Sequence, residues 1–543
     1  MLEHATEWES ISNVYYSKFK IYDLEWQLNT FEPYHIVSSP YSSTLAIYRD
    51  NSKLVPLSSS QLLGNGKSIN KPTIFIYTVS GIQIGTINAS STPIAVGFTK
   101  YDRLVIIYED GFYKVYNYSR SLNDVETHRI ESNDNNIIDA RICEDDTMVV
   151  LTSEFEFIEI KNGISNTLTN VDNFHDKPHD WNVIPSTRSN TAMTTVIANI
   201  NDGIFAIDSL TVVKSEISEM SINTFVKPSP NGRFIATLTS DKVLSIITSD
   251  FSKEVTKFDM KVIDNYVVND LIWCGSNAIG LIYDEPSPRM WLIGPGGEHI
   301  LYPYAYENNI KAFSTNSSSI VLTPTSVDII TKVPLSIQQT FLPGSTNPSA
   351  LLLSAFEQFE NQSSKSDDSV RAIGSDLFDG VIGCINAASE LWNIDQQRKL
   401  LKASQFGFEY LDSFNTQEFL NVGNKLRVIN NFRHPNVGIP LNINDYNVYE
   451  SEHILQLLIS RQLHLLALKI CQHLKMRCDF ILSHWACCKI LNSQSEYDDE
   501  ALVNVIVERV QSVTKSFIGW SDVAKVAYNC GRLTLATKVS ELF

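Results

Sequence analysis

Residues 35–334 repeat one short theme, and this repetition limits the possible folds more than any other feature of the chain. Each copy has a β-rich run, a tight polar turn and a second β-rich run. In the clearest copy, the runs Pro93–Phe98, Leu104–Tyr108 and Phe112–Tyr116 surround a turn at residues 109–111. Short β-rich runs separated by turn residues predict antiparallel strands joined by hairpins.

The central turn of this theme recurs at seven positions along the chain. These positions are Asp50, Gly111, Ser153, Gly203, Asp241, Glu285 and Thr325. Successive turns lie roughly 40 to 60 residues apart, a period typical of β-propeller blades. We therefore predict that residues 1–340 form a seven-bladed β-propeller.

The N-terminal residues are rich in aromatic side chains and precede the first repeat. We expect a short helix here, followed by a first strand, and the aromatic residues concerned are Trp8, Tyr15, Tyr16, Phe19, Tyr22 and Trp26. Because a propeller is circular, this strand is expected to join the last blade, which would leave the ring without a loose edge.

After Pro334 the apolar spacing changes to that of helices, and residues 341–543 are predicted to form an irregular α-solenoid. Residues 360–369 are polar and are expected to form an exposed loop. Residues 536–543 have helical character with no stop signal, so we expect the natural protein to be longer. The predicted helices span residues 350–360, 376–390, 395–410, 417–431, 450–460, 464–474, 479–491, 501–513 and 522–530.

Charge and composition exclude several classes of function. The 543-residue chain is 43% hydrophobic and 19% charged and has a net charge of −18. This negative charge argues against nucleic-acid binding and against direct docking on anionic lipids. It does not exclude a local basic patch. The start of the chain lacks the features of a signal peptide. The eight cysteines are expected to be reduced thiols of a cytosolic protein.

Two segments resemble ligand-binding motifs without meeting their requirements. Residues 64–68 (GNGKS) resemble the end of a P-loop, but Gln61 stands where that loop needs glycine, and a strand is predicted to follow. Residues 294–297 (GPGG) are predicted to form a turn between strands, whereas a dinucleotide-binding fingerprint opens a helix. We expect neither segment to bind a nucleotide.

Two groups of histidine and cysteine residues are candidate metal ligands. His175 and His179 are four residues apart, but Pro178 disfavours a helix that would align them. The second group lacks the paired Cys-x2-Cys spacing of zinc sites, so core packing is expected instead; its members are His473, Cys478, His484, Cys487 and Cys488.

Acidic pairs such as Glu109–Asp110 and Asp498–Asp499 are expected in solvated turns and loops, and no Gly-x-Ser-x-Gly elbow occurs. We therefore predict no catalytic, cofactor-binding or metal-binding residues, no cofactor, and a protein that is not an enzyme. The residues that bind partners stay unknown.

Several strings, in order along nearly the whole chain, resemble those of the vacuolar protein sorting-associated protein 16 family. Ser349 and Gln405 depart from the family pattern. Family members also continue into a longer C-terminal solenoid, so no partner-contact residues are transferred. The strings lie at residues 16–26, 272–275, 294–297, 348–353, 401–407, 438–441, 484–487 and 527–532.

The resemblance implies a scaffold subunit of the class C tethering complexes HOPS and CORVET, which support Rab-dependent tethering and SNARE-mediated membrane fusion. It implies other class C subunits as partners, and a Sec1/Munc18-type subunit held through the C-terminal region that this chain is expected to lack. Contact with SNAREs and Rab GTPases would be indirect. The implied location is cytoplasmic, peripheral to late endosome and vacuole or lysosome membranes.

Two other functions fit the same predicted architecture. One is a scaffold of a membrane coat or pore, which localisation and partner identity would distinguish from a tethering subunit. The other is an enzyme or ligand-binding propeller with its site in the central channel, which converging carboxylates or histidines at the channel mouth would favour.

Overall fold

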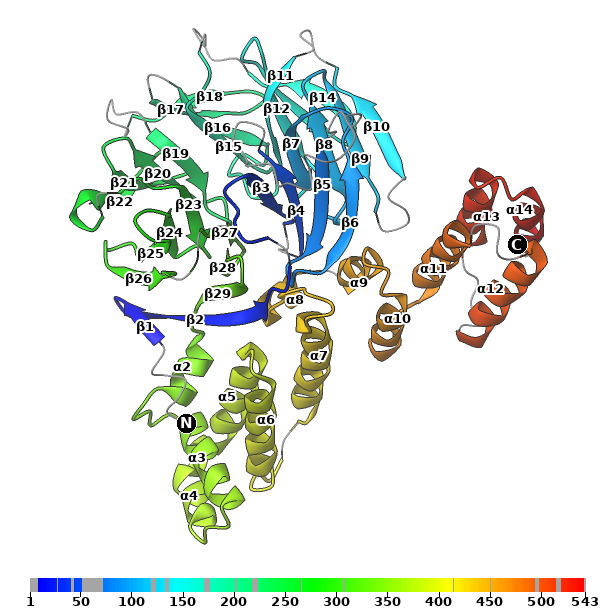
Figure 1. Ribbon diagram of the computed structural model, residues 1–543. Helices are drawn as coiled ribbons and strands as arrows, with labels where there is room; N and C mark the ends of the chain where they lie inside the picture. Colours follow the sequence, from blue (N-terminus) through cyan, green and yellow to red (C-terminus); the bar gives the residue numbers. More distant parts are fainter. Residues whose placement is uncertain are drawn as a thin grey trace.

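The computed structural model describes residues 8–541, except residues 27, 41–42, 51–71, 119–123, 132–135, 170–175, 201–202, 217–222, 265, 306, 308, 414, 450, 494–497 and 514–518. Its strands form seven sheets arranged as a ring, and helices follow (Figure 1). Six of the seven predicted central turns lie between the second and third strands of a blade, and Gly203 is the first residue of the third strand, β17. The prediction of a seven-bladed propeller followed by an α-solenoid is confirmed.

Six blades are antiparallel sheets of four consecutive strands. Their bounds are β3 (Tyr34–Ser38), β4 (Thr44–Arg49), β5 (Thr73–Thr78) and β6 (Gln83–Asn88) in blade 1; β7 (Pro93–Phe98), β8 (Leu104–Tyr108), β9 (Phe112–Tyr116) and β10 (Val125–Arg129) in blade 2; β11 (Ile137–Ile142), β12 (Met148–Thr152), β13 (Phe157–Lys161) and β14 (Ile164–Thr167) in blade 3; β15 (Asp180–Ile184), β16 (Thr195–Ile200), β17 (Gly203–Ile207) and β18 (Val212–Lys214) in blade 4; β19 (Asn223–Pro228), β20 (Phe234–Thr239), β21 (Val243–Thr248) and β22 (Glu254–Asp259) in blade 5; β23 (Asp270–Cys274), β24 (Ala278–Tyr283), β25 (Arg289–Ile293) and β26 (His299–Pro303) in blade 6.

Blade 7 closes the ring with strands from both ends of the propeller. It contains β27 (Lys311–Ser314), β28 (Ser318–Leu322) and β29 (Ser326–Lys332), followed in the sheet by β2 (Val14–Asp23) and β1 (Trp8–Ile11). Pairing of β2 with β29 satisfies the backbone groups that β29 would otherwise expose at a sheet edge. The predicted closing strand is therefore confirmed.

The short N-terminal helix predicted from the aromatic residues is wrong within the described part of the chain. Residues 8–23 form the hairpin β1–β2 instead. Tyr16 and Tyr22, on β2, are buried in the hydrophobic clusters of the propeller. Aromatic residues fit a pleated, half-buried surface well, so the gain from pairing with β29 favours strand over helix.

The burial pattern explains why the blades stack into a ring. The second strands of blades 3, 4 and 6, which are β12, β16 and β24, are buried along their whole length. Such strands carry near-continuous apolar sequences, because each face packs against a neighbouring blade. The fourth strands are more exposed, as in β10 and β22. The core of the propeller is thus a set of apolar layers between blades.

The helices follow β29 directly. Every helix predicted from the sequence overlaps an observed one. The helices are α2 (Leu335–Phe341), α3 (Pro348–Glu360), α4 (Ser366–Ile373), α5 (Leu377–Glu390), α6 (Ile394–Phe408), α7 (Gln417–Arg433), α8 (Ile443–Val448), α9 (Ser451–Ile459), α10 (His464–His473), α11 (Asp479–Asn492), α12 (Asp499–Val513), α13 (Trp520–Asn529) and α14 (Leu533–Ser540), and short 3₁₀ turns occupy Met260–Val262 and Gly374–Asp376.

Helix α4 replaces part of the loop expected at residues 360–369, so that expectation was wrong there. Asp367 and Asp368 lie in the first turn of α4, where negative charge stabilises a helix. Val370 and Ile373 are buried against the neighbouring helices. The helix was not predicted because most of its residues are polar and only one narrow face of it is buried.

The helical region has three successive hydrophobic cores, formed by α2–α6, by α7–α11 and by α11–α14. Figure 1 shows α2–α7 below the propeller, α8 and α9 beside it, and α11–α14 leading away from it. Each helix packs mainly on its neighbours, as in a solenoid. The domain boundary expected between residues 340 and 341 falls at the end of α2, and that division of the chain stays a prediction.

Candidate functional site

The first strands of the blades line the centre of the ring, and in most neighbouring blades they contact each other. One end of the central channel contains a cavity of about 630 Å³. Its lining comes mainly from the first strands of blades 1 to 5 and the loops that follow them, and from residues 314–316 of blade 7. This cavity is where an enzyme or ligand-binding propeller would hold its substrate.

Arg188 occupies this end of the channel. Its guanidinium forms an ion pair with Glu144 (2.6 Å), donates to the carbonyl oxygen of Pro230, and donates to Asn316 Oδ1 (3.1 Å). One side chain thus connects residues of blades 3, 5 and 7. Burial raises the pKa of Glu144, while the charge of Arg188 acts in the opposite direction. This carboxylate serves as a structural ion-pair partner.

Aspartates at the starts of the first strands also bond to neighbouring blades. Asp180 accepts a hydrogen bond from the backbone N–H of Val226 (2.8 Å), and Asp139 accepts one from Trp181 Nε1 (3.0 Å). Burial raises the pKa of Asp180, and Lys227 opposes that shift. These carboxylates hold blades 3, 4 and 5 together.

The structure places the other predicted motifs as follows. Residues 64–68 and His175 lie outside the described residues. Residues 294–297 form the turn between β25 and β26, as predicted. Glu109 and Asp110 lie in the turn between β8 and β9. Asp499 instead opens α12 and forms an ion pair with Arg532 (3.2 Å).

All eight cysteines lie in the described part of the chain, and none is in a disulfide. Burial raises the pKa of Cys274 to about 11 and that of Cys384 to about 12. A thiol with a raised pKa stays protonated and unreactive at neutral pH. Outside α11, the buried thiols Cys143, Cys274, Cys384 and Cys471 are thus packing groups, whereas Cys530 is exposed.

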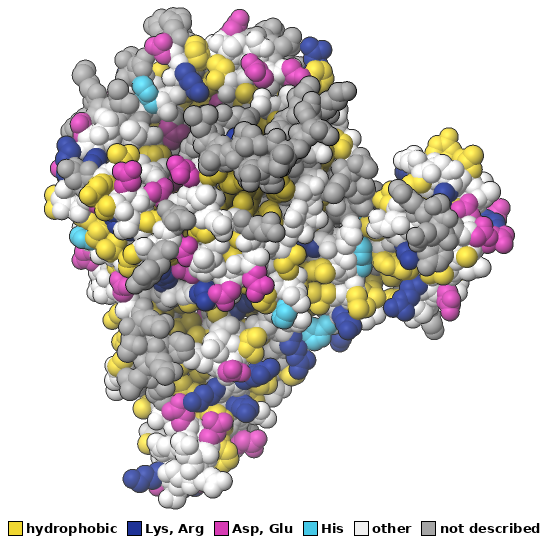
Figure 2. All heavy atoms as spheres, viewed as in Figure 1, with side chains coloured by type: hydrophobic (Ala, Val, Ile, Leu, Met, Phe, Trp, Pro, Cys, Tyr) yellow, Lys and Arg dark blue, Asp and Glu magenta, His cyan; other side chains and the backbone are white. Residues whose placement is uncertain are grey.

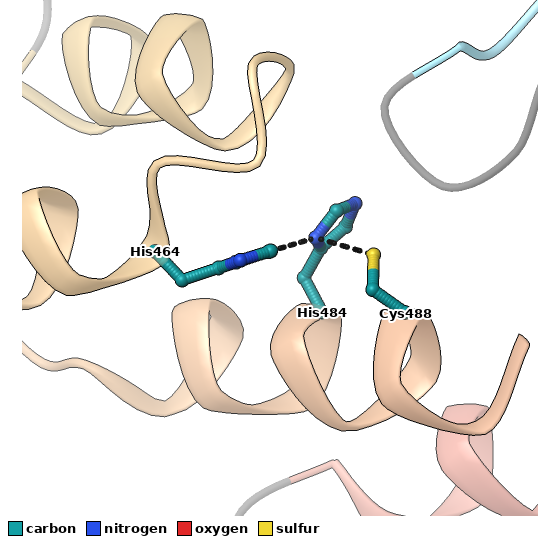
Figure 3. A group of neighbouring side chains, drawn as sticks. All are labelled: His464, His484 and Cys488. Atoms are coloured by element: carbon teal, nitrogen blue, oxygen red, sulfur yellow. Dashed lines mark hydrogen bonds between the residues drawn. The ribbon is translucent and has the colours of Figure 1, made fainter. Parts of the chain in front are cut away.

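Two members of the predicted histidine and cysteine group come together in α11, along with one residue that the sequence did not single out. His464, His484 and Cys488 converge, and their nitrogen and sulfur atoms lie within 4.8 Å of one another (Figure 3). Among the described residues, no other group of three potential metal ligands is this close. His464 was missed because it lies 20 residues before His484, without a recognisable ligand spacing.

The helices return to the propeller at a junction formed by α7, α8 and α9. Asn442, at the start of α8, donates to Ser317 Oγ in blade 7 (2.7 Å). Arg461, after α9, donates to the carbonyl oxygen of Ser43 in blade 1 (2.5 Å). The ring of Trp392 packs against Phe19 of β2, with 5.5 Å between centroids. The junction thus joins α8 and α9 to two blades whose residues lie more than 100 positions away in the sequence.

Arg433 anchors the α7 side of this junction. Its guanidinium lies 3.9 Å from the centre of the Trp392 ring and donates to the carbonyl oxygens of Leu441 (2.8 Å) and Leu391 (2.9 Å). Burial lowers the pKa of Arg433 to about 9. Arginine is suited to this position because its planar group can stack and donate several hydrogen bonds at once.

A cavity of about 800 Å³ lies between these helices and the propeller. Its walls include residues of β2 and β29 on one side and of α2, α6 and α7 on the other. Figure 2 shows Lys and Arg side chains interspersed with Asp and Glu side chains over the helices below the propeller. The junction therefore fixes the helices to the propeller while leaving a recess accessible from outside.

Replacement of Gly438 by alanine should weaken this junction. Gly438 has a φ of +65°, and a Cβ there would lie 2.3 Å from Ser80 Oγ and 2.9 Å from Ser80 Cβ. We expect Gly438→Ala to lower the free energy of unfolding by about 2–3 kcal/mol, from backbone strain and from the steric clash.

Gly344→Ala is the matched control for this variant. Gly344 has a φ of +78°, and a Cβ there would meet nothing within 4 Å. It should cost only the backbone strain, about 1 kcal/mol. Urea unfolding would measure both variants, and equal losses would contradict the packing of Gly438 on Ser80.

Stability should also fall when His453, on α9, becomes protonated. Its ring packs on Tyr101 of blade 2, with 5.4 Å between centroids. Burial, together with the charge of Lys100, lowers the pKa of His453 to about 4. As the pH falls, His453 binds a proton in the unfolded chain before it does so in the folded protein. The contribution of neutral His453 to stability is therefore complete above pH 6.5 and is lost as the pH falls. We expect a loss of about 2 kcal/mol between pH 7.5 and pH 5.

Asp445 changes the stability in the opposite direction in the same pH range, because burial raises the pKa of its carboxyl group to about 6. Its protonation stabilises the folded protein as the pH falls. The effect of His453 is therefore measured as the difference between the wild type and His453→Gln in urea unfolding at each pH. A difference that does not change with pH would contradict the buried, neutral state of His453.

Within the part of the chain that the structure describes, no helix has the length and apolar character needed to cross a membrane.

Comparison with known proteins adds to this description. The chain is 28% identical to the vacuolar protein sorting-associated protein 16 homolog of Dictyostelium discoideum, over 99% of this chain and 64% of that protein. It is 27% identical to the probable homolog of Schizosaccharomyces pombe, over 98% and 63%. It is 26% identical to Protein VACUOLELESS1 of Arabidopsis thaliana, over 99% and 64%. The chain thus spans just under two thirds of the length of these relatives.

Among solved structures, the β-propeller domain of Cps50 (Swd1) from Myceliophteria thermophila is similar over 57% of this chain and 99% of that domain, with a TM-score of 0.38 and 10% identity. Residues 4–421 match the family described as Vps16, N-terminal region. This match covers more than half of the chain and includes the propeller, helices α2 to α6 and the first residues of α7. The chain therefore belongs to the Vps16 N-terminal region family.

Proposed function

We propose that this protein is a scaffold subunit of a HOPS/CORVET-type membrane-tethering complex and that it has no catalytic activity. The observation that carries this proposal is the family match over residues 4–421. Relatives named for vacuolar protein sorting, similar over nearly all of this chain, support the same role. In that role the protein would support Rab-dependent tethering and SNARE-mediated fusion at endosomes and the vacuole or lysosome.

The architecture suits such work. A closed propeller offers broad, rigid faces, and a solenoid extends the reach of a subunit while allowing slight bending. The contacts of Asn442 with Ser317 and of Arg461 with Ser43 fix α8 and α9 to two blades. Partners bound to the propeller and to the helices would thus be held at a defined distance. Binding of this kind requires complementary surfaces and no cofactor.

The proposed partners are the other class C subunits, with a Sec1/Munc18-type subunit bound through a region beyond this chain. SNAREs and Rab GTPases would be reached through those subunits. The proposed location is the cytoplasmic side of late endosome and vacuole or lysosome membranes, with peripheral and indirect attachment.

The test is affinity purification of the full-length protein from cells that lack the untagged copy. We expect large solenoid partners in near-equal amounts, identified by mass spectrometry as tethering subunits, together with normal sorting of vacuolar cargo. Recovery of the protein as a lone monomer would contradict the proposal. Recovery of coat or pore components in place of tethering subunits would replace it with the other scaffold role.

A channel variant tests the absence of catalysis. Glu144→Gln removes the charge of a channel carboxylate that pairs with Arg188. We expect partner recovery and cargo sorting to stay at wild-type levels in a folded variant. Loss of sorting with an intact complex would indicate chemistry in the channel.

A further inference from the structure

The group His464, His484 and Cys488 is built from two helices. His464 is the first residue of α10, and His484 and Cys488 lie one turn apart on α11. Residues four apart share one face of a helix, so these two side chains point the same way. Figure 3 shows His464 reaching the same point from the neighbouring helix. The fold thus brings two imidazoles and one thiol together.

The distances in this group are close to those of a zinc site. His464 Nε2 lies 2.9 Å from His484 Nδ1, and Cys488 Sγ lies 3.5 Å from the same nitrogen. Tetrahedral zinc, with Zn–N bonds of about 2.0 Å and Zn–S bonds of about 2.3 Å, holds its ligand atoms about 3.3 to 3.6 Å apart. The sulfur is already at that separation from His484. The two histidines would need to move apart by a few tenths of an ångström. His464 and Cys488, whose ligand atoms lie within 4.8 Å of each other, would need to be held about 3.5 Å apart by the ion.

Hydrogen bonding accounts less well for the same arrangement. A neutral imidazole nitrogen has one position in the ring plane, which holds either a hydrogen or a lone pair. Nδ1 of His484 therefore cannot form a good in-plane hydrogen bond with both His464 and Cys488. A metal ion between the three side chains would use one lone pair from each of them.

Burial and ligand chemistry favour zinc in particular. Cys488 is 4% exposed, while the two histidines are half-buried, so the thiol is sheltered and the site stays within reach of an ion in solution. A mixed set of imidazole and thiolate ligands suits zinc better than calcium or magnesium, which prefer oxygen.

The position of the group gives the ion a structural effect. Residues of α11 up to Ile481 belong to the core shared with α7–α10, and those from Leu482 onward belong to the core shared with α12–α14. His464 and His484 therefore lie where one core ends and the next begins. Bonds from one ion to both helices would fix α10 against α11 at this joint.

We propose that His464, His484 and Cys488 form a zinc site with water as the fourth ligand, and that the bound ion stiffens the joint between α10 and α11. This proposal does not depend on the proposed tethering role, since it rests on three side chains of this chain alone.

The first test uses the unmodified full-length protein, purified without chelators and analysed by elemental mass spectrometry. We expect about one zinc per chain. After removal of zinc, added Co²⁺ should give visible bands of tetrahedral cobalt together with a near-ultraviolet sulfur-to-cobalt band. Zinc at about 100 times its dissociation constant should raise the thermal midpoint by a few degrees. Absence of zinc, even after reconstitution, together with no cobalt spectrum, would overturn the proposal.

The second test uses ligand variants. Cys488→Ser should abolish the sulfur-to-cobalt band and reduce zinc content at least tenfold, and His464→Gln should reduce zinc content while keeping the fold. Cys530→Ser is the matched control, because Cys530 is an exposed thiol at the end of α13. Equal zinc loss in Cys530→Ser, or unchanged zinc in both ligand variants, would overturn the assignment. If Cys488→Ser does not fold, His464→Gln and the cobalt spectrum of the unmodified protein decide the question.

Discussion

Trp273→Ala should lower the free energy of unfolding by about 3–5 kcal/mol, the usual cost of removing a large aromatic side chain from a core. Trp273 is 3% exposed and lies on β23, the first strand of blade 6. Its Nε1 donates to the carbonyl oxygen of Lys227 in blade 5 (2.9 Å), and its backbone N–H donates to Ser314 Oγ in blade 7 (2.9 Å). The residue therefore connects three consecutive blades, and alanine would leave a cavity between them.

Trp273→Phe separates the contributions of packing and hydrogen bonding. Phenylalanine keeps much of the buried volume and loses the bond to Lys227, so we expect a smaller loss, about 1–2 kcal/mol. Leu210→Ala is the surface control, since Leu210 is 70% exposed and should change stability by less than about 0.5 kcal/mol. Urea unfolding followed by tryptophan fluorescence and circular dichroism would measure all three. An unchanged midpoint for Trp273→Ala would contradict the burial of this side chain.

Arg461→Met should destabilise the attachment of α9 to the propeller by about 3–5 kcal/mol, the range expected when one member of a buried charged group is removed. Arg461 donates to the carbonyl oxygen of Ser43, close to the buried carboxylate of Asp102. Asp102 accepts hydrogen bonds from Ser43 Oγ (2.6 Å) and Thr44 Oγ1 (3.0 Å). Burial raises the pKa of Asp102, and the charge of Arg461 opposes this shift. Without the arginine, Asp102 would lose its nearby positive charge.

A double-mutant cycle with Asp102→Asn tests this coupling. If the two charges stabilise each other, the double variant should lose less stability than the sum of the single variants. Because propeller and helices can unfold separately, amide hydrogen exchange in α9 and in the turn at residues 99–103 should accompany the unfolding curves. Strictly additive losses, or unchanged exchange in α9 of Arg461→Met, would show that this contact does not hold the junction together.

The parts of the fold that depend on local pattern could be predicted from the sequence. The turns at Gly111 and Asp241 lie between the second and third strands of their blades, because hairpins are formed by residues close together in the chain. The helix predicted at residues 417–431 is observed as α7, because the apolar spacing of a helix also involves residues close together in the chain. Errors arose where distant partners decided the outcome. Residues 8–11 form a strand because β2 pairs with β29, more than 300 residues later.

The candidate sites also include features that follow from local sequence and features that only distant contacts create. Residues 294–297 could be assigned to a turn from their glycines, and this assignment is confirmed. The contact between Arg461 and Ser43 joins residues 418 positions apart, and no spacing rule connects them. His464 joined His484 and Cys488 only through the packing of α10 on α11.

The sequence by itself determined the number of blades and the change from strands to helices after Pro334, because apolar periodicity and turn residues act over short distances along the chain. Particular residue strings along the chain indicated the family, and the match over residues 4–421 shows it. The tertiary structure alone decided how the ring closes through β2 and β29, how α7–α9 attach to the propeller and which ligand atoms meet at His484. These features depend on side chains that are brought together only when the whole chain folds. They therefore cannot be predicted from patterns among residues that are neighbours in the sequence.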